Sequence, residues 1–231
     1  FNTSNQMGTT GDFVKIFEQN GFKTENMGKM SFFSNIIVPY RDLTGGADMN
    51  LLANKEGTLL ENKSGKDRGT MIQENGAAFY ITDKTGYDSF YRIRKHVGLG
   101  YYSEGATLEE LAEKLGVDPA TFAATMETSN KAVADQKDDE FGRLSFASAL
   151  DTAPYYAIKV SPGIHHTMGG LKINTNAEVL TEAGEAIPGL YAAGEVTGGV
   201  HGANRLGGNA VADIVVFGRI AAQNAAAYIA K

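Results

Sequence analysis

Two glycine-rich segments near the end of the chain combine residue types that bind hydroxylated chains and anions. Residues 189–195 read Gly-Leu-Tyr-Ala-Ala-Gly-Glu, which predicts a short buried strand that ends at Glu195. A carboxylate at a strand end can accept hydrogen bonds from the hydroxyl groups of a sugar-like chain. Residues 201–210 read His-Gly-Ala-Asn-Arg-Leu-Gly-Gly-Asn-Ala and lead into a long alanine-rich helix.

The second of these segments has the features of an anion site. Glycines let the backbone approach a ligand, and a helix N-terminus offers free N–H groups and a partial positive charge. Arg205 adds a planar fork that suits a carboxylate. We therefore predict a site for an anion, or for a ring that gains negative charge on reduction. The alternative is a structural turn with a solvent-exposed Arg205, because isolated glycine patterns are weak motifs.

A pair of adjacent histidines precedes another glycine pair in residues 165–170, which read His-His-Thr-Met-Gly-Gly. Neighbouring side chains point in different directions, so His165 and His166 are expected to serve different ligands. A zinc site that recruits His201 is an alternative. It is disfavoured because no pair of ligands at metal-binding spacing accompanies the histidines.

These three segments resemble the C-terminal signature of the fumarate reductase flavoprotein family, whose soluble members include flavocytochrome c fumarate reductases and urocanate reductases. The similarity is strong over 152–231 and weaker over 1–150. In the weaker part, residues 10–12 resemble the family's passage from the FAD domain into a capping domain, and residues 54–57 resemble its cap hairpin.

In that family a hydride passes from flavin N5 to an alkene beside a carboxylate, under a cap that closes and excludes water. The resemblance implies FAD as the cofactor and a small unsaturated carboxylate as the substrate. An electron-donor domain or protein is left open as a further partner.

The resemblance also implies roles for individual residues. His165 and Arg205 would hold a substrate carboxylate, close to the backbone at Gly208. Arg68 would take the place of the catalytic acid, although the family's Thr-Arg-Asp-like order is reversed here in Lys-Asp-Arg-Gly. The residues expected to contact FAD are Gly11, Asp12, His166, Glu195, Ala210 and Val211.

The sequence departs from the family where a proton relay refills the acid. Residues 30–33 lack the family's substrate-binding histidine, and Asp42 is the only acid in residues 42–46. Arg41 and Asp42 are the expected substitute pair, and the substrate is expected to differ from fumarate.

Two other functions stay open. The first is a flavin dehydrogenase or oxidase of the same superfamily, which the missing relay favours and the retained His165 and Arg205 oppose. The second is a non-catalytic fragment without flavin. It is motivated by the absence of a G-x-G-x-x-G motif after a strand, so that no site for the ADP pyrophosphate is present in 1–231.

The elements that must position these residues predict an α+β fold. We expect an inserted capping domain, 26–165, flanked by pieces of a partial α/β FAD-binding domain, 1–25 and 166–231, that lacks the N-terminal dinucleotide-binding motif. Helices are predicted from Asp12, as N-cap, to residue 20, from Thr107 to Gly116, after Asp118-Pro119, and over 209–230. Strands are predicted over 32–40, 50–53, 77–82, 155–160, 171–173 and 190–193.

Composition narrows the function further. The 231 residues carry a net charge of −6 and no cysteine, which excludes disulfides, iron–sulfur ligation and thiol catalysis within the chain. The absence of a dominant Lys/Arg run disfavours nucleic acid as a partner. No membrane span is expected, and a cytoplasmic or extracytoplasmic location is left open. Because the chain starts at Phe1 in what reads as the middle of a domain, we expect it to be a fragment.

Overall fold

The computed structural model describes residues 2–44, 51–53, 78–138, 146 and 148–230. The chain divides into two compact units. Unit 1 comprises 1–4 and 33–163, and unit 2 comprises 5–32 and 164–231. The domain boundaries predicted from the sequence lie instead at 25/26 and 165/166. Secondary structure is mixed α/β, in agreement with the predicted α+β class.

Unit 1 is organised around the long strand β7 (Tyr155–Thr167), whose last residues belong to unit 2. β5 (Ala78–Thr82) pairs with β7 in antiparallel register, from Ala78 opposite Val160 to Thr82 opposite Tyr156. β6 (Ser103–Gly105) also pairs antiparallel with β7, and β4 (Leu51–Ala53) extends the sheet beyond β5. β1 (Asn2–Thr3) and β3 (Met30–Ile37) complete the sheet on β7.

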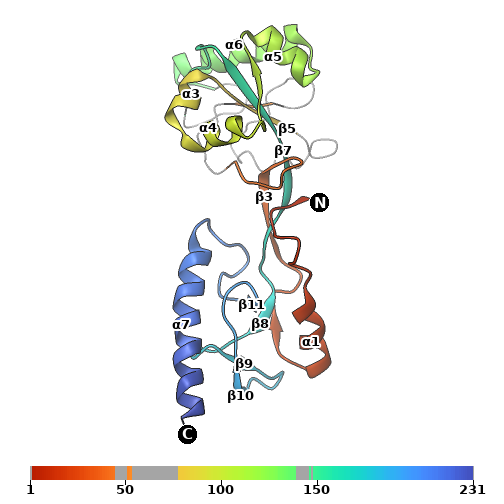
Figure 1. Ribbon diagram of the computed structural model, residues 1–231, viewed down its shortest axis with the longest axis vertical. Coiled ribbons are helices and arrows are strands. Elements are labelled where there is room, and N and C mark those ends of the chain that lie inside the picture. The colour runs from red at the N-terminus through yellow and green to blue at the C-terminus, as the bar shows by residue number, and fades with distance from the viewer. Residues whose placement is uncertain (1, 45–50, 54–77, 139–145, 147, 231) are drawn as a thin grey trace. The chain divides into compact units, whose positions relative to one another are not determined.

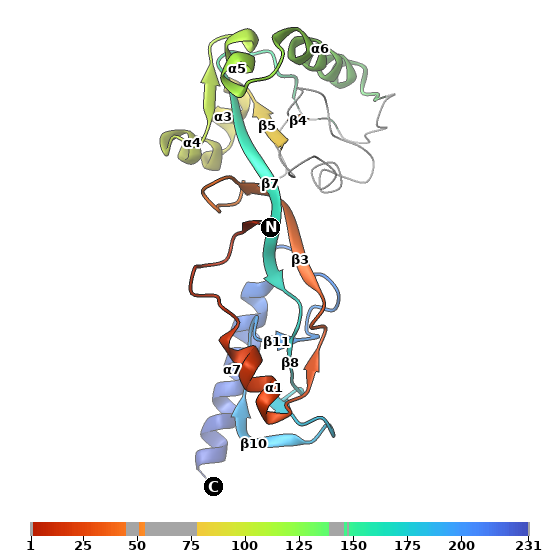
Figure 2. The same ribbon diagram turned by 90° about the vertical axis from the view of Figure 1, so that its right-hand side faces the viewer.

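Among the described residues of unit 1, the helices that pack on this sheet are α3 (Lys84–Ser89), α4 (Tyr91–Gly98), α5 (Leu108–Leu115) and α6 (Pro119–Asp135). Figure 2 shows α5 and α6 together beside the start of β7. Phe122 and Met126 of α6 pack with Leu111 of α5 and Ile81 of β5 in a buried cluster. Phe122 and Met126 therefore form the core face of α6, and Val133 is only half-buried.

Local capping explains the helices that the sequence predicted. Thr107 Oγ1 accepts the Glu110 N–H at 3.2 Å, and Asp118 accepts the Thr121 N–H at 2.8 Å. Glu110 reaches back to the Ala106 N–H at 2.8 Å, one residue earlier than a capping box requires. Both α5 and α6 thus begin at their predicted residues.

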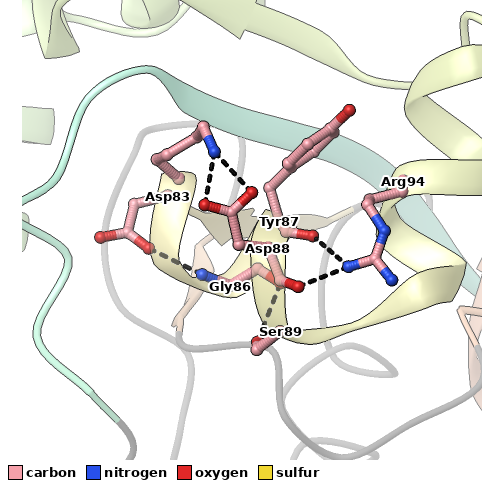
Figure 3. A network of polar contacts seen from close by, with 7 residues as sticks. Asp83, Gly86, Tyr87, Asp88, Ser89 and Arg94 are labelled. Carbon is pink, nitrogen blue, oxygen red and sulfur yellow. Dashed lines mark hydrogen bonds and ion pairs between the residues drawn. The ribbon is translucent and has the colours of Figure 1, made fainter.

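α3 and α4 were not predicted, and a tertiary contact explains why α3 forms. Asp83 is fully buried and accepts the Gly86 N–H at 3.1 Å, which caps the helix. Its other oxygen accepts the backbone N–H groups of Asp151 and Thr152 at 3.3 and 3.1 Å. Figure 3 shows this cap beside the Arg94 side chain of α4, which donates to the carbonyl oxygens of Tyr87 and Asp88 at the end of α3.

Unit 2 holds two small sheets and two helices (Figure 1). β2 (Thr24–Glu25) and β11 (Thr197–Gly198) flank β8 (Gly170–Lys172), β2 antiparallel and β11 parallel to it. β9 (Glu178–Leu180) pairs with β10 (Ala186–Tyr191). Helices α1 (Asp12–Asn20) and α7 (Asn209–Ile229) contribute Phe17 and Phe217 to one core around Leu171.

Glycines make the three-stranded sheet of unit 2 possible by their lack of a side chain. A Cβ on Gly170 would lie 2.2 Å from the Val196 carbonyl oxygen, and one on Gly198 would lie 2.3 Å from that of Glu25. The backbone itself would have to move to admit either atom. Gly169 and Gly170, expected to form a turn, are absent from the positive-φ residues, so close packing is what Gly170 is required for.

Two local predictions differ from the structure, and a third falls on residues that it does not describe. Gly11 at φ 73°, and not Asp12, is the N-cap of α1, and no side chain caps this helix. β10, expected to be buried, is largely exposed or half-buried because it pairs only with β9 in the described chain. The predicted cap hairpin at 54–57 lies outside the described residues.

Candidate functional site

A cavity of about 310 Å³ in unit 2 brings together segments that are far apart in the sequence. It contains three of the residues predicted to contact FAD: Gly11, Asp12 and Glu195. Its remaining lining residues are Gly8, Thr9, Thr10, Phe13, Val14, Phe17, Met27, Gly169, Gly170 and Val196. The cavity thus combines apolar side chains suited to a ring with hydroxyl and carboxylate groups suited to a hydroxylated chain.

The turn at the start of α1 forms one wall of this cavity. Gly11 adopts the left-handed conformation that favours glycine, and Thr10 Oγ1 donates to Asp12 Oδ2 at 2.8 Å. Because no side chain caps α1, its first N–H groups remain available to a ligand. The wall therefore offers backbone donors next to an acidic side chain.

Glu195 also lines the cavity and directly follows Gly194, whose φ is 82°. Its Oε1 accepts both the backbone N–H of Thr167, at 2.8 Å, and the hydroxyl of Thr167, at 3.1 Å. One oxygen of the carboxylate that was expected to bind ligand hydroxyls is therefore hydrogen-bonded to the end of β7. The bond also ties the strand that carries both histidines to the loop after β10.

The two histidines near the end of β7 have different surroundings. Burial, followed by the positive charge of Arg205, lowers the pKa of His165 below its ordinary value, although Glu195 opposes this shift. Burial is also the main cause that lowers the pKa of His166, and here Glu195 is the largest opposing influence. Both rings are consequently neutral at pH 7 and can donate one N–H each without adding positive charge.

Arg205 is 8% exposed, so the alternative of a solvent-exposed arginine is wrong. Its Nη1 donates to the Leu206 carbonyl oxygen at 3.1 Å, while its Nε is buried without a hydrogen-bond partner in the described part of the chain. A buried guanidinium with unused donors is an attractive position for an anionic ligand. Its electrostatic effect on both His165 and His166 places all three side chains in one neighbourhood.

The start of α7 follows directly. Gly208 at φ 85° is the N-cap, and no side chain caps the helix. The N–H groups of Asn209 and Val211 donate to the carbonyl oxygens of Leu206 and Gly208, which leaves the Ala210 N–H for a ligand. Ala210 is half-buried and Val211 is 63% exposed, and neither lines the cavity. Two sets of predicted site residues therefore come together. The first set interacts electrostatically and comprises His165, His166, Glu195 and Arg205. The second set lines the cavity and comprises Gly11, Asp12 and Glu195.

Two predictions at the catalytic acid and its relay have different outcomes. Arg68 lies outside the described residues. Asp42 was expected to pair with Arg41, but its Oδ2 lies 3.3 Å from His96 Nε2 and 3.7 Å from Lys95 Nζ. The Nε of Arg41 donates instead to the Thr3 carbonyl oxygen at 3.0 Å. The left-handed conformation of Arg41, with φ 61°, accompanies this different direction.

The sequence analysis missed one polar pair beside the site. His201 Nε2 lies 3.1 Å from Asp213 Oδ2, and the His201 ring packs edge-on against the His166 ring. Asp213 could have been noticed as the single acidic residue in the otherwise apolar helix 209–229. Among the residues that the structure describes, no group of three His, Cys, Asp or Glu side chains could hold a metal ion.

α7 is long and apolar enough to cross a membrane, judged by length and composition alone. One such helix is weak support for a span, because core helices of folded domains meet the same criterion. Phe217, Ile220 and Ala221 of α7 pack against the core of unit 2, which accounts for part of its apolar character.

Comparison with known proteins defines the class of protein. Residues 1–211 match the FAD binding domain family, and the chain belongs to that family. FAD is accordingly its cofactor. The cavity residues fit such a group, because apolar walls adjoin the N-terminus of α1 and a carboxylate.

Several relatives of the chain are named as reductases. The chain is 38% identical to the fumarate reductase (cytochrome) of Shewanella frigidimarina over all of this chain and 42% of that protein. It is 31% identical to the urocanate reductase of Eggerthella lenta over 97% of this chain and 40% of that one. A solved flavocytochrome c3 fumarate reductase in an open conformation superposes with a TM-score of 0.85 and 37% identity, over 99% of this chain and 42% of that one. The chain therefore spans less than half of the proteins it resembles.

Proposed function

We propose that this chain is the substrate-clamping part of an FAD-dependent reductase of a small, fumarate-like unsaturated carboxylate. The observation that carries the proposal is the buried Arg205 with unused donors beside His165. Relatives named as fumarate and urocanate reductases support a carbon–carbon double bond beside a carboxylate as the reactive group.

The residues at this site are suited to binding a carboxylate more than to donating or accepting protons. Arg205 supplies a fixed positive charge, and His165, kept neutral by its lowered pKa, supplies a directional N–H. FAD, when bound, supplies the hydride. Gly11, Asp12, His166, Glu195, Ala210 and Val211 are the residues proposed to hold it, together with the uncapped N-terminus of α7. Arg68 is retained as the proposed proton donor to the substrate.

The segment 26–165, which contains most of unit 1, is proposed to be a cap that moves. Gly21, Gly163, Gly169 and Gly170 flank it as proposed hinge positions. The relative solved in an open conformation supports a protein that opens and closes. Small-angle scattering of the FAD-loaded protein with and without succinate should show two different distances between the units, and identical curves would remove the moving cap.

The reaction is tested by supplying electrons from a reduced viologen dye to the longer, FAD-loaded protein that carries this chain. Dye oxidation that depends on fumarate, acrylate or urocanate supports the proposal and identifies the substrate. Dye reduction on adding saturated substrates, with no alkene reduction, would instead favour the dehydrogenase. Loss of both activities in a protein without flavin absorbance would favour a non-catalytic fragment.

A further inference from the structure

His201 and the buried Asp213 form a polar pair to which the proposed function gives no role. Their side chains approach within 3.1 Å, and only 3% of the Asp213 side chain is exposed. Asp213 Oδ1 is buried without a hydrogen-bond partner among the described residues, so His201 is the contact that stabilises this carboxylate. Burial of a carboxylate is costly unless the group is paired. A residue retained at such a cost in an apolar helix is a functional candidate.

The loop that carries Arg205 needs an anchor. Between β11 and α7 the chain forms turns without a helix or strand, and Gly199, Gly202 and Gly208 have φ angles of 90°, 65° and 85°. Glycine-rich backbone loses much conformational freedom when it is ordered. The hydrogen bond from Arg205 goes to its neighbour Leu206 and so does not attach the loop to another element.

Two hydrogen bonds of described side chains attach this loop to the rest of unit 2. Asn26 Nδ2 donates to the Gly202 carbonyl oxygen at 3.1 Å, which holds the outer part of the loop. His201 joins it to Asp213, on the second turn of α7. The second contact fixes the loop to α7, the helix whose N-terminus is proposed to hold FAD.

The same histidine also contacts the proposed flavin-binding histidine. The ring centroids of His166 and His201 lie 5.8 Å apart with an interplanar angle of 88°. His166 is 5% exposed and its Nδ1 has no hydrogen-bond partner in the described chain, so ring packing is a main restraint on its orientation. Asp213, His201 and His166 therefore form a continuous contact from α7 through the loop to β7.

We propose that Asp213 and His201 are positioning residues of the carboxylate site. Asp213 accepts a hydrogen bond from His201 Nε2 and fixes the orientation of that ring. His201 in turn holds the loop that presents Arg205 and restricts the His166 ring. The inference rests on the proposed function, because the site that is positioned is the proposed carboxylate site.

The experiment compares three variants of the 231-residue chain with the wild type. Asp213→Leu removes the acceptor and keeps a side chain branched at Cγ, and Asp213→Asn keeps a neutral acceptor. Asn224→Ala is the matched control, because it removes a 3.0 Å hydrogen bond from the same helix, to the Asn176 carbonyl oxygen, at the far end from His201. Calorimetry measures the affinity for succinate, thermal melting reports stability, and NMR follows the imidazole signals of the four histidines.

We expect Asp213→Leu to weaken succinate binding by about tenfold or more, since misplaced binding groups are costly, and to shift the His166 signals. Asp213→Asn should restore both properties to near the wild type, and Asn224→Ala should change neither. Unchanged affinity and unchanged His166 signals in Asp213→Leu would overturn the inference, as would equal losses of affinity in Asn224→Ala.

Failure of the proposed function gives a different result. If the wild-type chain binds no succinate, the carboxylate clamp lacks support in this chain, and the inference is decided by the His166 signals alone. A shift in Asp213→Leu that Asp213→Asn reverses would then still support positioning of His166 through His201. An absence of that shift would reject it.

Discussion

At the residue scale, Arg205 and His96 show how burial gives a charged or titratable side chain a specific role. Arg205 is buried with unused donors, next to histidines whose pKa values are lowered by burial. His96 of α4 is 1% exposed and stacks on the Tyr101 ring, with Asp42 as its polar partner. The first arrangement favours binding of an anion, and the second makes the stability of unit 1 depend on pH.

Replacement of Arg205 by lysine keeps the charge but removes the planar fork. A charge-assisted hydrogen bond contributes about 1.5–3 kcal/mol, so loss of one or two predicts a fall in kcat/KM of roughly tenfold to a thousandfold. FAD content should stay near normal, because the proposed flavin contacts lie on other residues. The measurement uses the longer, FAD-loaded protein and records flavin absorbance, Tm and alkene reduction on one preparation.

Arg219→Lys provides the control, since Arg219 is an exposed arginine on α7, the helix that follows the loop carrying Arg205. It should leave all three quantities unchanged. Wild-type kinetics in Arg205→Lys would remove the carboxylate clamp, whereas a joint loss of Tm and FAD would indicate a structural arginine.

The pH dependence of stability follows from His96. Burial lowers its pKa in the folded protein, with Asp42 opposing the shift, so the unfolded chain binds the proton more readily. The stability that the neutral His96 contributes is therefore complete above the unfolded pKa of about 6.5, and it is lost as the pH falls below that value. Burial by itself raises the pKa of Asp42, but the Leu43 N–H, His96 and Lys95 together lower it, so this carboxylate loses its contribution only at more acidic pH.

We expect the Tm of the wild type to fall between pH 7 and pH 5, and to fall less in His96→Gln. His165 and His166 also have lowered pKa values and will retain part of the slope. The measurement is a series of melting curves at constant ionic strength. An equally steep fall in His96→Gln would show that His96 does not link protonation to unfolding.

At the element scale, the buried cap of α3 joins a helix to a distant turn. Asp83 accepts three backbone N–H groups, one in α3 and two in the turn before β7 (Figure 3 shows the α3 side). α3 is only six residues long and contains Gly86, so its own helix propensity is low. The helix therefore depends on a contact between residues almost seventy positions apart.

Asp83→Ala should lower the free energy of unfolding by about 3 kcal/mol, because buried N–H groups lose a charged acceptor. Urea denaturation followed by circular dichroism measures this change. Asp118→Ala is the control, since Asp118 caps α6 at the exposed surface, and it should cause a smaller loss. Equal losses in the two variants would mean that the contacts of Asp83 with the turn contribute nothing.

At the scale of the whole molecule, the chain contains one part of a flavin-binding protein. It spans 42% of the Shewanella relative, and no G-x-G-x-x-G motif occurs in its sequence. The cavity in unit 2 has residues suited to a flavin ring and its hydroxylated chain. The pyrophosphate is normally held by a glycine-rich turn at a helix N-terminus, which a chain without that motif does not offer.

The 231-residue chain alone is therefore expected to bind FAD weakly, with a Kd on the order of micromolar or higher. Equilibrium dialysis with FAD measures the affinity, and riboflavin, which lacks the ADP part, serves as the comparison. The two ligands should bind with similar strength. Sub-micromolar binding of FAD would contradict the expectation and would require a phosphate site within these residues.

The sequence by itself determined the features that depend on neighbouring residues. Both ends of α5 are marked by Thr107 and Gly116, and the start of α6 is marked by the Asp118-Pro119 pair, because caps and proline act within one helical turn. The motif residues around His165 and Arg205 likewise identified the family, since their spacing is a property of the chain.

The tertiary structure decided what depends on residues far apart in the chain. It buried Arg205, paired Asp42 with His96, placed Asp213 against His201, and gave Asp83 the partners that allow α3 to form. It also showed that Gly170 is required for space between strands. Burial, charge and close contact are set by which segments pack together, and periodicity and capping rules carry no information about that packing.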